Sequence, residues 1–103
     1  MFKLIFYVPI ADAQQVKQAL FKAGAGKIGN YENCSFETPG IGQFLPMNGA
    51  KPALGAVGKL ERVSELKVEM ICIPEKIQLV IKVLKETHPY EEPAYEVIKL
   101  ENF

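Results

Sequence analysis

Residues 61–100, which read ERVSELKVEM ICIPEKIQLV IKVLKETHPY EEPAYEVIKL, contain the signals for a strand, a helix and a second strand. Apolar and polar residues alternate along residues 61–73, which predicts a strand with one buried face. That face carries four apolar side chains, Leu66, Val68, Met70 and Cys72.

A helix is predicted after this strand. Pro74 occupies a position typical of a first helical residue, where a backbone N–H is not needed. The apolar stripe of the helix repeats with a period near 3.6 residues and consists of Ile77, Val80, Ile81 and Leu84. The helix must end near Thr87 because Pro89 disfavours helical geometry at His88, and the last strand is expected over residues 94–100.

The N-terminal part of the chain also has a strand followed by a helix. Residues 2–8 alternate as a strand with both faces partly buried. Asp12 is expected to cap the first helix, with Gln15 as its capping-box partner. The apolar stripe of this helix consists of Val16, Ala19, Leu20 and Ala23. Gly24 is the natural stop signal.

The middle of the chain is rich in glycine and proline. A strand is predicted over residues 31–38, and Pro39 and Gly40 suit the two central positions of a type II turn. Residues 43–45 are then expected to return as a short hairpin partner. Residues 46–60 form a long connection, which is uncommon inside a small domain and is often functional.

The predicted elements follow the order β-α-β-(β)-β-α-β, which is that of a ferredoxin-like α+β sandwich with an extra hairpin and a long loop between the central strands. The 103 residues are expected to form a single domain. Two helices on one side leave the other face of the sheet open, and this face carries Ile5, Tyr7, Ile71 and Ile73. An oligomer interface is the simplest way to cover these apolar side chains.

The composition bears on partners and location. Twelve Lys and Arg residues balance twelve Asp and Glu residues, so there is no electrostatic case for a nucleic acid or an anionic membrane as partner. No apolar run approaches the roughly 20 residues that span a bilayer. Cys34 and Cys72 do not make a disulfide framework. Because residues 1–9 do not form an export signal, a reduced, cytoplasmic location is expected.

The segment His88-Pro89-Tyr90-Glu91-Glu92-Pro93-Ala94-Tyr95 resembles the signature of the YqfO family. In the larger Nif-three-like (NGG-interacting-factor-like) proteins this unit is an insert. Residues 26–31, 34–36, 40–44 and 49–52 are similar to the family pattern in order and spacing, so the resemblance covers nearly the whole chain.

The resemblance implies a fold related to the PII signalling proteins and the CutA proteins, which are ferredoxin-like and trimeric. A homo-oligomer is therefore expected, with a trimer favoured over a dimer. Larger Nif-three-like proteins carry a dinuclear metal site, and some are named as GTP cyclohydrolases. The resemblance places those metal ligands in flanking domains, so this enzyme activity is not expected of the chain itself.

His88, Glu91 and Glu92 are the first candidates for ligand chemistry. Imidazole and carboxylate groups bind divalent metals, and copper, zinc or nickel is the predicted metal of this cluster. The same groups also serve in proton transfer. In the structural alternative, His88 caps the last carbonyls of the second helix. Tyr90 and Tyr95 are of the residue type that anchors interfaces.

Lys51 and Lys59 lie in the long connection, at the place where PII-like proteins carry a regulatory loop. With nearby glycine amides they are predicted to hold a small anionic ligand. The alternative is a packed or mobile loop with solvated lysines. Residues 24–29 match G-x-G-x-x-G, but a helix precedes them and a strand follows, which is the reverse of the dinucleotide-binding order.

The leading hypothesis for function is a non-enzymatic, oligomeric binding or regulatory module. It would present the long connection and residues 88–92 at or near clefts between subunits. A divalent-metal-binding protein that uses His88 with Glu91 or Glu92 is the first alternative. A small accessory protein related to hydrolases or cyclohydrolases is the second, and it rests on analogy alone.

Overall fold

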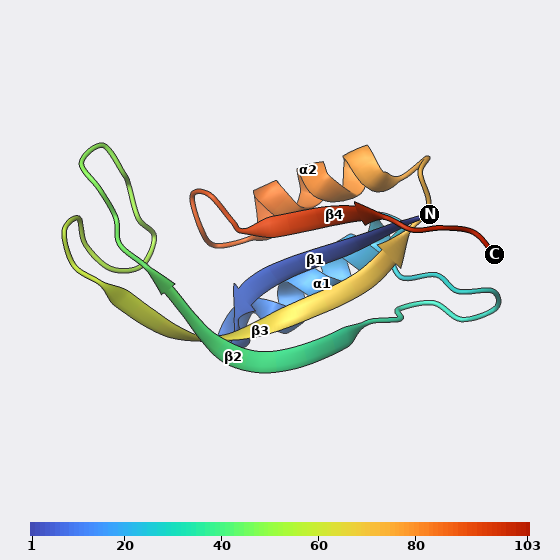
Figure 1. The fold of residues 1–103 in the computed structure, drawn as a ribbon, viewed down its shortest axis with the longest axis horizontal. Coiled ribbons are helices and arrows are strands. Elements are labelled where there is room, and N and C mark those ends of the chain that lie inside the picture. The colour runs from blue at the N-terminus through green and yellow to red at the C-terminus, as the bar shows by residue number, and fades with distance from the viewer.

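Four strands form one antiparallel sheet in the order β2-β3-β1-β4 (Figure 1). The structure, a computed structural model, describes residues 1–103. The strands are β1 (Phe2–Pro9), β2 (Phe36–Phe44), β3 (Glu61–Cys72) and β4 (Tyr95–Lys99). This order, with β1 and β3 in the centre, is that of the split β-α-β fold and confirms the predicted ferredoxin-like class.

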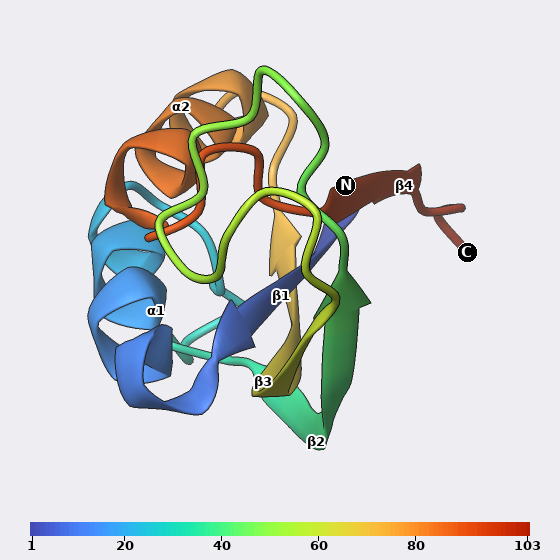
Figure 2. The same cartoon turned by 90° about the vertical axis from the view of Figure 1, so that its left-hand side faces the viewer.

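Both α-helices cover the same face of the sheet (Figure 1, Figure 2). They are α1 (Ala13–Lys22) and α2 (Ile77–Thr87), and they pack against each other. Between helices and sheet lies a cluster whose largest fully buried side chains are Phe6, Leu4, Leu20, Leu84, Val8, Val16, Val68 and Val80. Each such side chain stabilises the fold by about 1.5–3 kcal/mol through removal of apolar area from water. The apolar stripes of both predicted helices therefore face the core as expected.

The helix ends differ in detail from the sequence predictions. A short 3-10 helix, η1 (Ile10–Asp12), precedes α1, and Asp12 makes no side-chain capping bond. The predicted capping box with Gln15 is therefore wrong, because Asp12 itself has helical backbone geometry instead of the extended geometry of a capping residue. The helix α2 begins at Ile77, after a turn that contains Pro74. It ends at Thr87 as predicted, and the next residue is extended.

Strand β2 is continuous, and the predicted turn at Pro39 and Gly40 is wrong. Nine consecutive residues pair with β3, from Phe36 opposite Glu69 to Phe44 opposite Glu61. A proline is tolerated there because β2 is an edge strand. The N–H groups on its outer side have no neighbouring strand to bond to, so the missing N–H of a proline leaves no acceptor unpaired. The long β2–β3 ladder therefore replaces the expected extra hairpin.

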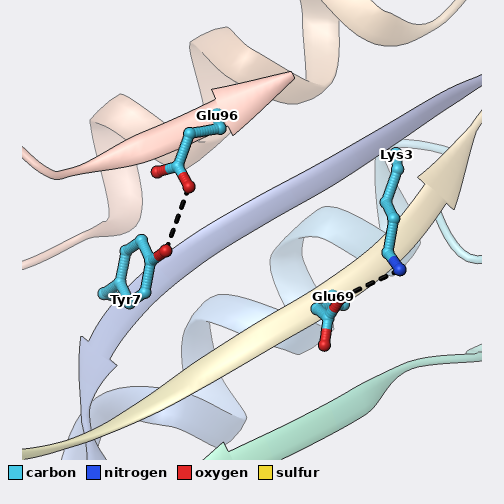
Figure 3. Close-up of polar contacts among 4 residues, drawn as sticks. All are labelled: Lys3, Tyr7, Glu69 and Glu96. Carbon is cyan, nitrogen blue, oxygen red and sulfur yellow. Dashed lines mark hydrogen bonds and ion pairs between the residues drawn. The ribbon is translucent and has the colours of Figure 1, made fainter. Parts of the chain in front are cut away.

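The face of the sheet opposite the helices, here called the open face, combines polar pairs with apolar residues. Lys3 forms an ion pair with Glu69 at 2.9 Å, and the hydroxyl of Tyr7 donates a hydrogen bond to Glu96 at 3.0 Å (Figure 3). Ile5 lies in register between Glu69 and Glu96 and is only 7% exposed. Thus the chain itself already covers one of the residues that were expected to need an interface.

The molecule is elongated, with extents of 46 × 24 × 24 Å. Its length comes from the β2–β3 ladder and the connection that follows it, which project past the helices (Figure 1). Residues 45–60, here called the central loop, are closed at the base by a hydrogen bond from the Gly58 amide to the Pro46 carbonyl. Neither α-helix is long and apolar enough to cross a bilayer.

Candidate functional site

The segment from His88 to Ala94, here called the corner, links α2 to β4 and is organised by the histidine ring. His88 is 5% exposed. Its Nε2 atom lies 2.7 Å from the carbonyl oxygen of Tyr7 on β1, and its Nδ1 atom lies 3.1 Å from the amide nitrogen of Tyr90. Because a carbonyl only accepts and an amide only donates, Nε2 carries the proton and Nδ1 accepts. The ring is therefore neutral and bridges the corner to β1.

Burial lowers the pKa of His88 below its ordinary value of 6.5. The bond to the Tyr7 carbonyl and the charges of Glu65 and Asp12 act in the opposite direction, but they are smaller. The predicted cap on the last carbonyls of α2 is wrong, since the ring reaches a carbonyl of β1. It is the backbone amide of His88 that bonds to the Leu84 carbonyl at the end of α2.

The residues predicted to bind a metal do not converge. No group of three or more His, Cys, Asp or Glu side chains is placed to hold a metal ion. Both ring nitrogens of His88 are bonded within the chain, and Glu91 instead accepts a hydrogen bond from the Lys51 amide at 3.1 Å. Coordination by His88 would break at least one of the two ring bonds, and Glu92 is exposed.

The corner places Tyr90 against a buried carboxylate on β3. The hydroxyl of Tyr90 donates a hydrogen bond to Oε2 of Glu65 at 2.8 Å, and Glu65 is 8% exposed. The Tyr90 ring also packs against Phe44 at 5.6 Å and His88 at 5.0 Å between ring centroids. Burial, the bond to Glu65 and nearby negative charges raise the pKa of Tyr90, so its hydroxyl stays a donor at neutral pH.

Two glycines of β2 make room for this carboxylate. Gly40 pairs with Glu65 in register, and Gly42 lies two residues further along the same face. A Cβ atom at Gly42 would overlap Oε1 of Glu65, whereas a Cβ atom at Gly40 would meet nothing within 4 Å. Glycine inside a strand often marks such a close approach. Gly42 is therefore the residue that permits the position of Glu65.

The corner, the central loop and the β2–β3 ladder enclose a cavity of about 240 Å³. Figure 2 shows the central loop beside the corner. Fourteen residues line the cavity, and eight of them are hydrophobic. The aromatic ones are Tyr7, Phe44 and Tyr90, and the charged ones are Glu65, Glu91 and Glu92. No lysine, arginine or histidine is among them, so the lining is acidic and aromatic.

The remaining predicted residues lie outside the lining. Lys51 connects the central loop to the corner through its backbone amide, and neither Lys51 nor Lys59 lines the cavity. The charge of the cavity is therefore opposite to that expected for the anionic ligand of the sequence prediction. Tyr95 packs against the core, with the Lys85 ammonium 5.7 Å from its ring centroid. It is thus separate from Tyr90.

Sequence reasoning missed four residues of this site: Tyr7, Gly42, Phe44 and Glu65. One signal was available. Gly40 and Gly42 alternate within a segment that can form a strand, and this spacing leaves space on one face only. The partner that fills the space lies on another strand, so the spacing alone does not identify Glu65.

The cysteines and the glycine-rich segment do not add to the site. Cys72 is buried, and burial raises the pKa of its thiol. Cys34 is partly buried and is not among the residues that line the cavity. Gly26 has a φ of 77°, and its amide bonds to the Ile71 carbonyl. This supports a tight turn for residues 24–29, as the order of elements had indicated.

Comparison with known proteins identifies relatives along nearly the whole chain. A protein of Bacillus subtilis named "GTP cyclohydrolase 1 type 2 homolog" is 46% identical over 99 residues, which are 96% of this chain and 26% of that protein. No family model matches the chain. The chain therefore spans about a quarter of the length of the curated relatives it matches.

Solved structures agree with this relationship. The Bacillus cereus protein related to NIF3 superposes with a TM-score of 0.83 at 42% identity, over 98% of this chain and 26% of that one. The CutA protein of Archaeoglobus fulgidus gives a TM-score of 0.70 at 20% identity, over 100% of this chain and 87% of that one. The likeness to the CutA protein shows a shared fold. The chain thus resembles the YqfO and Nif-three-like proteins over nearly its whole length, matches about a quarter of the length of these larger proteins, and has a CutA-like fold.

Proposed function

We propose that the chain is a non-enzymatic binding or regulatory module whose ligand occupies the cavity between the central loop and the corner. The observation that carries the proposal is the buried Glu65 carboxylate, which faces this cavity with one oxygen bonded to Tyr90. A buried polar group placed in a mostly apolar concave site is typical of small-molecule binding sites.

The parts of the site are fixed before any ligand arrives. His88 ties the corner to β1, Tyr90 ties it to β3, and Glu91 ties it to the central loop. Fixing side chains in advance reduces the conformational entropy that binding would otherwise cost. The arrangement therefore favours a binding site over a merely structural turn.

We further propose a homo-oligomer, with a trimer favoured over a dimer, in the cytoplasm. Large apolar side chains remain accessible on the open face, and Phe36 is 69% exposed and Ile98 is 47% exposed. The CutA-like fold is in keeping with such an assembly. An interface across this face would cover side chains that the helices leave free.

The relatives are named as homologues of a GTP cyclohydrolase. A role in that activity would belong to the whole, longer protein. The cavity offers this role no specific support. A nucleoside triphosphate such as GTP is strongly anionic. The lining carries three carboxylates and no lysine, arginine or histidine. Like charges at close range disfavour its binding there.

Native mass spectrometry of the freshly purified, untagged protein tests this proposal, together with thermal unfolding in the presence of a small-molecule library. We expect an oligomer with a bound mass that denaturation removes, or a compound that raises the melting temperature. Gly42→Ala should abolish this binding because it displaces Glu65, and Gly40→Ala should keep it. A bare mass with no stabilising compound, or equal binding by both variants, contradicts the proposal.

A further inference from the structure

The side chains that line the cavity indicate which class of ligand it would bind. We propose that it binds a small organic cation, with an ammonium group at Oε1 of Glu65 and an apolar or aromatic body between the rings of Tyr7, Phe44 and Tyr90. This inference rests on the proposed function and names the class of ligand that the same site would take.

Glu65 has no positively charged partner within the chain. The ion pairs of the chain join Lys3 to Glu69 and Lys17 to Glu37, and neither involves Glu65. Glutamate is rarely this buried unless it is paired, because loss of water destabilises its charged form. The Tyr90 hydroxyl satisfies Oε2 only. A positively charged ligand would supply the missing partner.

Oε1 of Glu65 is free to accept a hydrogen bond from a ligand. Glu65 lines the cavity, and no protein donor bonds to Oε1. Every fully buried side-chain nitrogen or oxygen has a hydrogen-bond partner, so Oε1, which has none, keeps some accessible surface. The absence of a side chain at Gly42 provides the room that Oε1 occupies. The carboxylate is thus placed to accept a hydrogen bond from a ligand.

The lining of the cavity combines negative charge with aromatic surface. Glu91 and Glu92 add two further carboxylates to the lining, and no basic side chain offsets them. Aromatic rings attract a cation through the negative charge on their faces. The combination of three carboxylates with three aromatic rings therefore favours a cation that also has an apolar part.

The electrostatic environment of Tyr90 supports the same sign of charge. Besides burial and its bond to Glu65, the charges of Glu65, Asp12 and Glu61 all raise the pKa of this hydroxyl. Each of these groups stabilises a positive charge in its neighbourhood, just as each disfavours the tyrosinate anion. The negative potential extends beyond the three carboxylates of the lining.

The size of the cavity limits the ligand. A volume of about 240 Å³ lies just below the roughly 300–1,000 Å³ of typical ligand sites. A single aromatic ring with a short aminomethyl group suits a space of this size.

The test compares three probes of matched shape and different charge: benzylammonium, benzyl alcohol and benzoate. Isothermal titration calorimetry on the whole chain should show that benzylammonium binds about tenfold or more tightly than benzyl alcohol, and that benzoate does not bind. Glu65→Gln keeps the shape and an acceptor for Tyr90 but removes the charge, so this variant should lose the preference. Gly42→Ala should also lose it, and Gly40→Ala should retain it.

Glu92→Gln provides a second variant, which should keep the fold because Glu92 is exposed. We expect it to weaken benzylammonium binding by a smaller factor than Glu65→Gln. Absence of benzylammonium binding at millimolar concentration, or an unchanged preference in both Glu variants, overturns the proposal.

Two outcomes separate this inference from the proposed function. If benzoate or benzyl alcohol binds as well as benzylammonium and Gly42→Ala abolishes all binding, the cavity is a ligand site but the cation preference is wrong. If the Glu65→Gln substitution instead dissociates the oligomer and no probe binds, a basic side chain of a second copy supplies the charge. That result overturns the small-molecule proposal.

Discussion

The apolar core and the cavity end of the molecule are built on different principles. On the helix side, the core consists of apolar residues that recur at regular spacing along each element, and its buried side chains require no particular partner. At the cavity end, hydrogen bonds join specific partners, several of which lie far apart in the sequence. His88 and Tyr7 are separated by 81 residues, Lys51 and Glu91 by 40, and Glu65 and Tyr90 by 25.

This difference separates stability from binding. Non-directional apolar packing supplies most of the free energy of folding, so substitutions in the core should affect the whole chain. Directional hydrogen bonds at the cavity end fix a few side chains in one arrangement. Substitutions there should therefore change the shape and the ligand preference of the cavity with a smaller effect on global stability. The following predictions test this contrast, in order of decreasing effect.

The largest effect is expected for Phe6→Ala, at the centre of the core. Phe6 is 0% exposed, so its truncation removes a large apolar side chain and leaves a cavity. We expect a loss of about 3–5 kcal/mol in the free energy of unfolding, measured with urea. The matched control is Phe36→Ala on the open face, which should change stability by less than about 0.5 kcal/mol in the monomer. Equal losses for both variants would remove the distinction between the two faces.

A smaller loss is expected for His88→Ala. The substitution leaves the buried Tyr7 carbonyl and the Tyr90 amide without their partner, and an unsatisfied buried group costs about 1–3 kcal/mol. His88→Gln retains an amide donor near the position of Nε2 and should recover part of this loss. Urea unfolding of the two variants provides the comparison. If the Gln variant is no more stable than the Ala variant, the bond to Tyr7 does not hold the corner.

The pH dependence of stability follows from the same ring. Because burial lowers the pKa of His88 in the folded state, the unfolded chain takes up a proton first as the pH falls. Stability is therefore complete above the unfolded pKa of 6.5 and decreases as the pH falls through it. Urea midpoints between about pH 7.5 and 5.5 should show this decrease in the wild type and a flatter profile in His88→Gln. A wild-type protein that gains stability over this range would contradict the neutral, buried ring.

The smallest effect is expected for Tyr7→Phe. The hydroxyl of Tyr7 donates to Glu96 on the solvent-exposed open face, where water can replace the lost bond. Stability should change by less than about 0.5 kcal/mol, and the bond from His88 to the Tyr7 carbonyl should be unaffected because it involves the backbone. A loss as large as that of His88→Ala would mean that the exposed Tyr7–Glu96 pair contributes as much to stability as the buried His88 bridge.

Much of the fold could be predicted because apolar periodicity is a local property of the sequence. The stripes on α1 and α2 and the buried face of β3 are examples. The turn at Pro39 and Gly40 was wrong because local turn chemistry was outweighed by nine consecutive pairs between β2 and β3. Context of this kind is not encoded in a dipeptide.

The candidate site could be predicted only in part. The density of His, Pro, Tyr and Glu in the corner identified Tyr90, Glu91 and Glu92, which line the cavity. Glu65 looked like an ordinary polar residue on an alternating strand, because its burial depends on Gly42 and Tyr90. The role of His88 as a bridge depends on a backbone carbonyl of β1. Every residue has such a carbonyl, so the sequence does not identify this partner.

The most direct test of this account is an NMR titration of the ¹⁵N-labelled chain with benzylammonium. The account predicts that the largest shifts of backbone amide signals lie at Gly42, Glu65, Tyr90 and Lys51, around the cavity, and that they saturate. Shifts centred on Phe36 and Ile98 on the open face, or no saturable shifts at all, would contradict it.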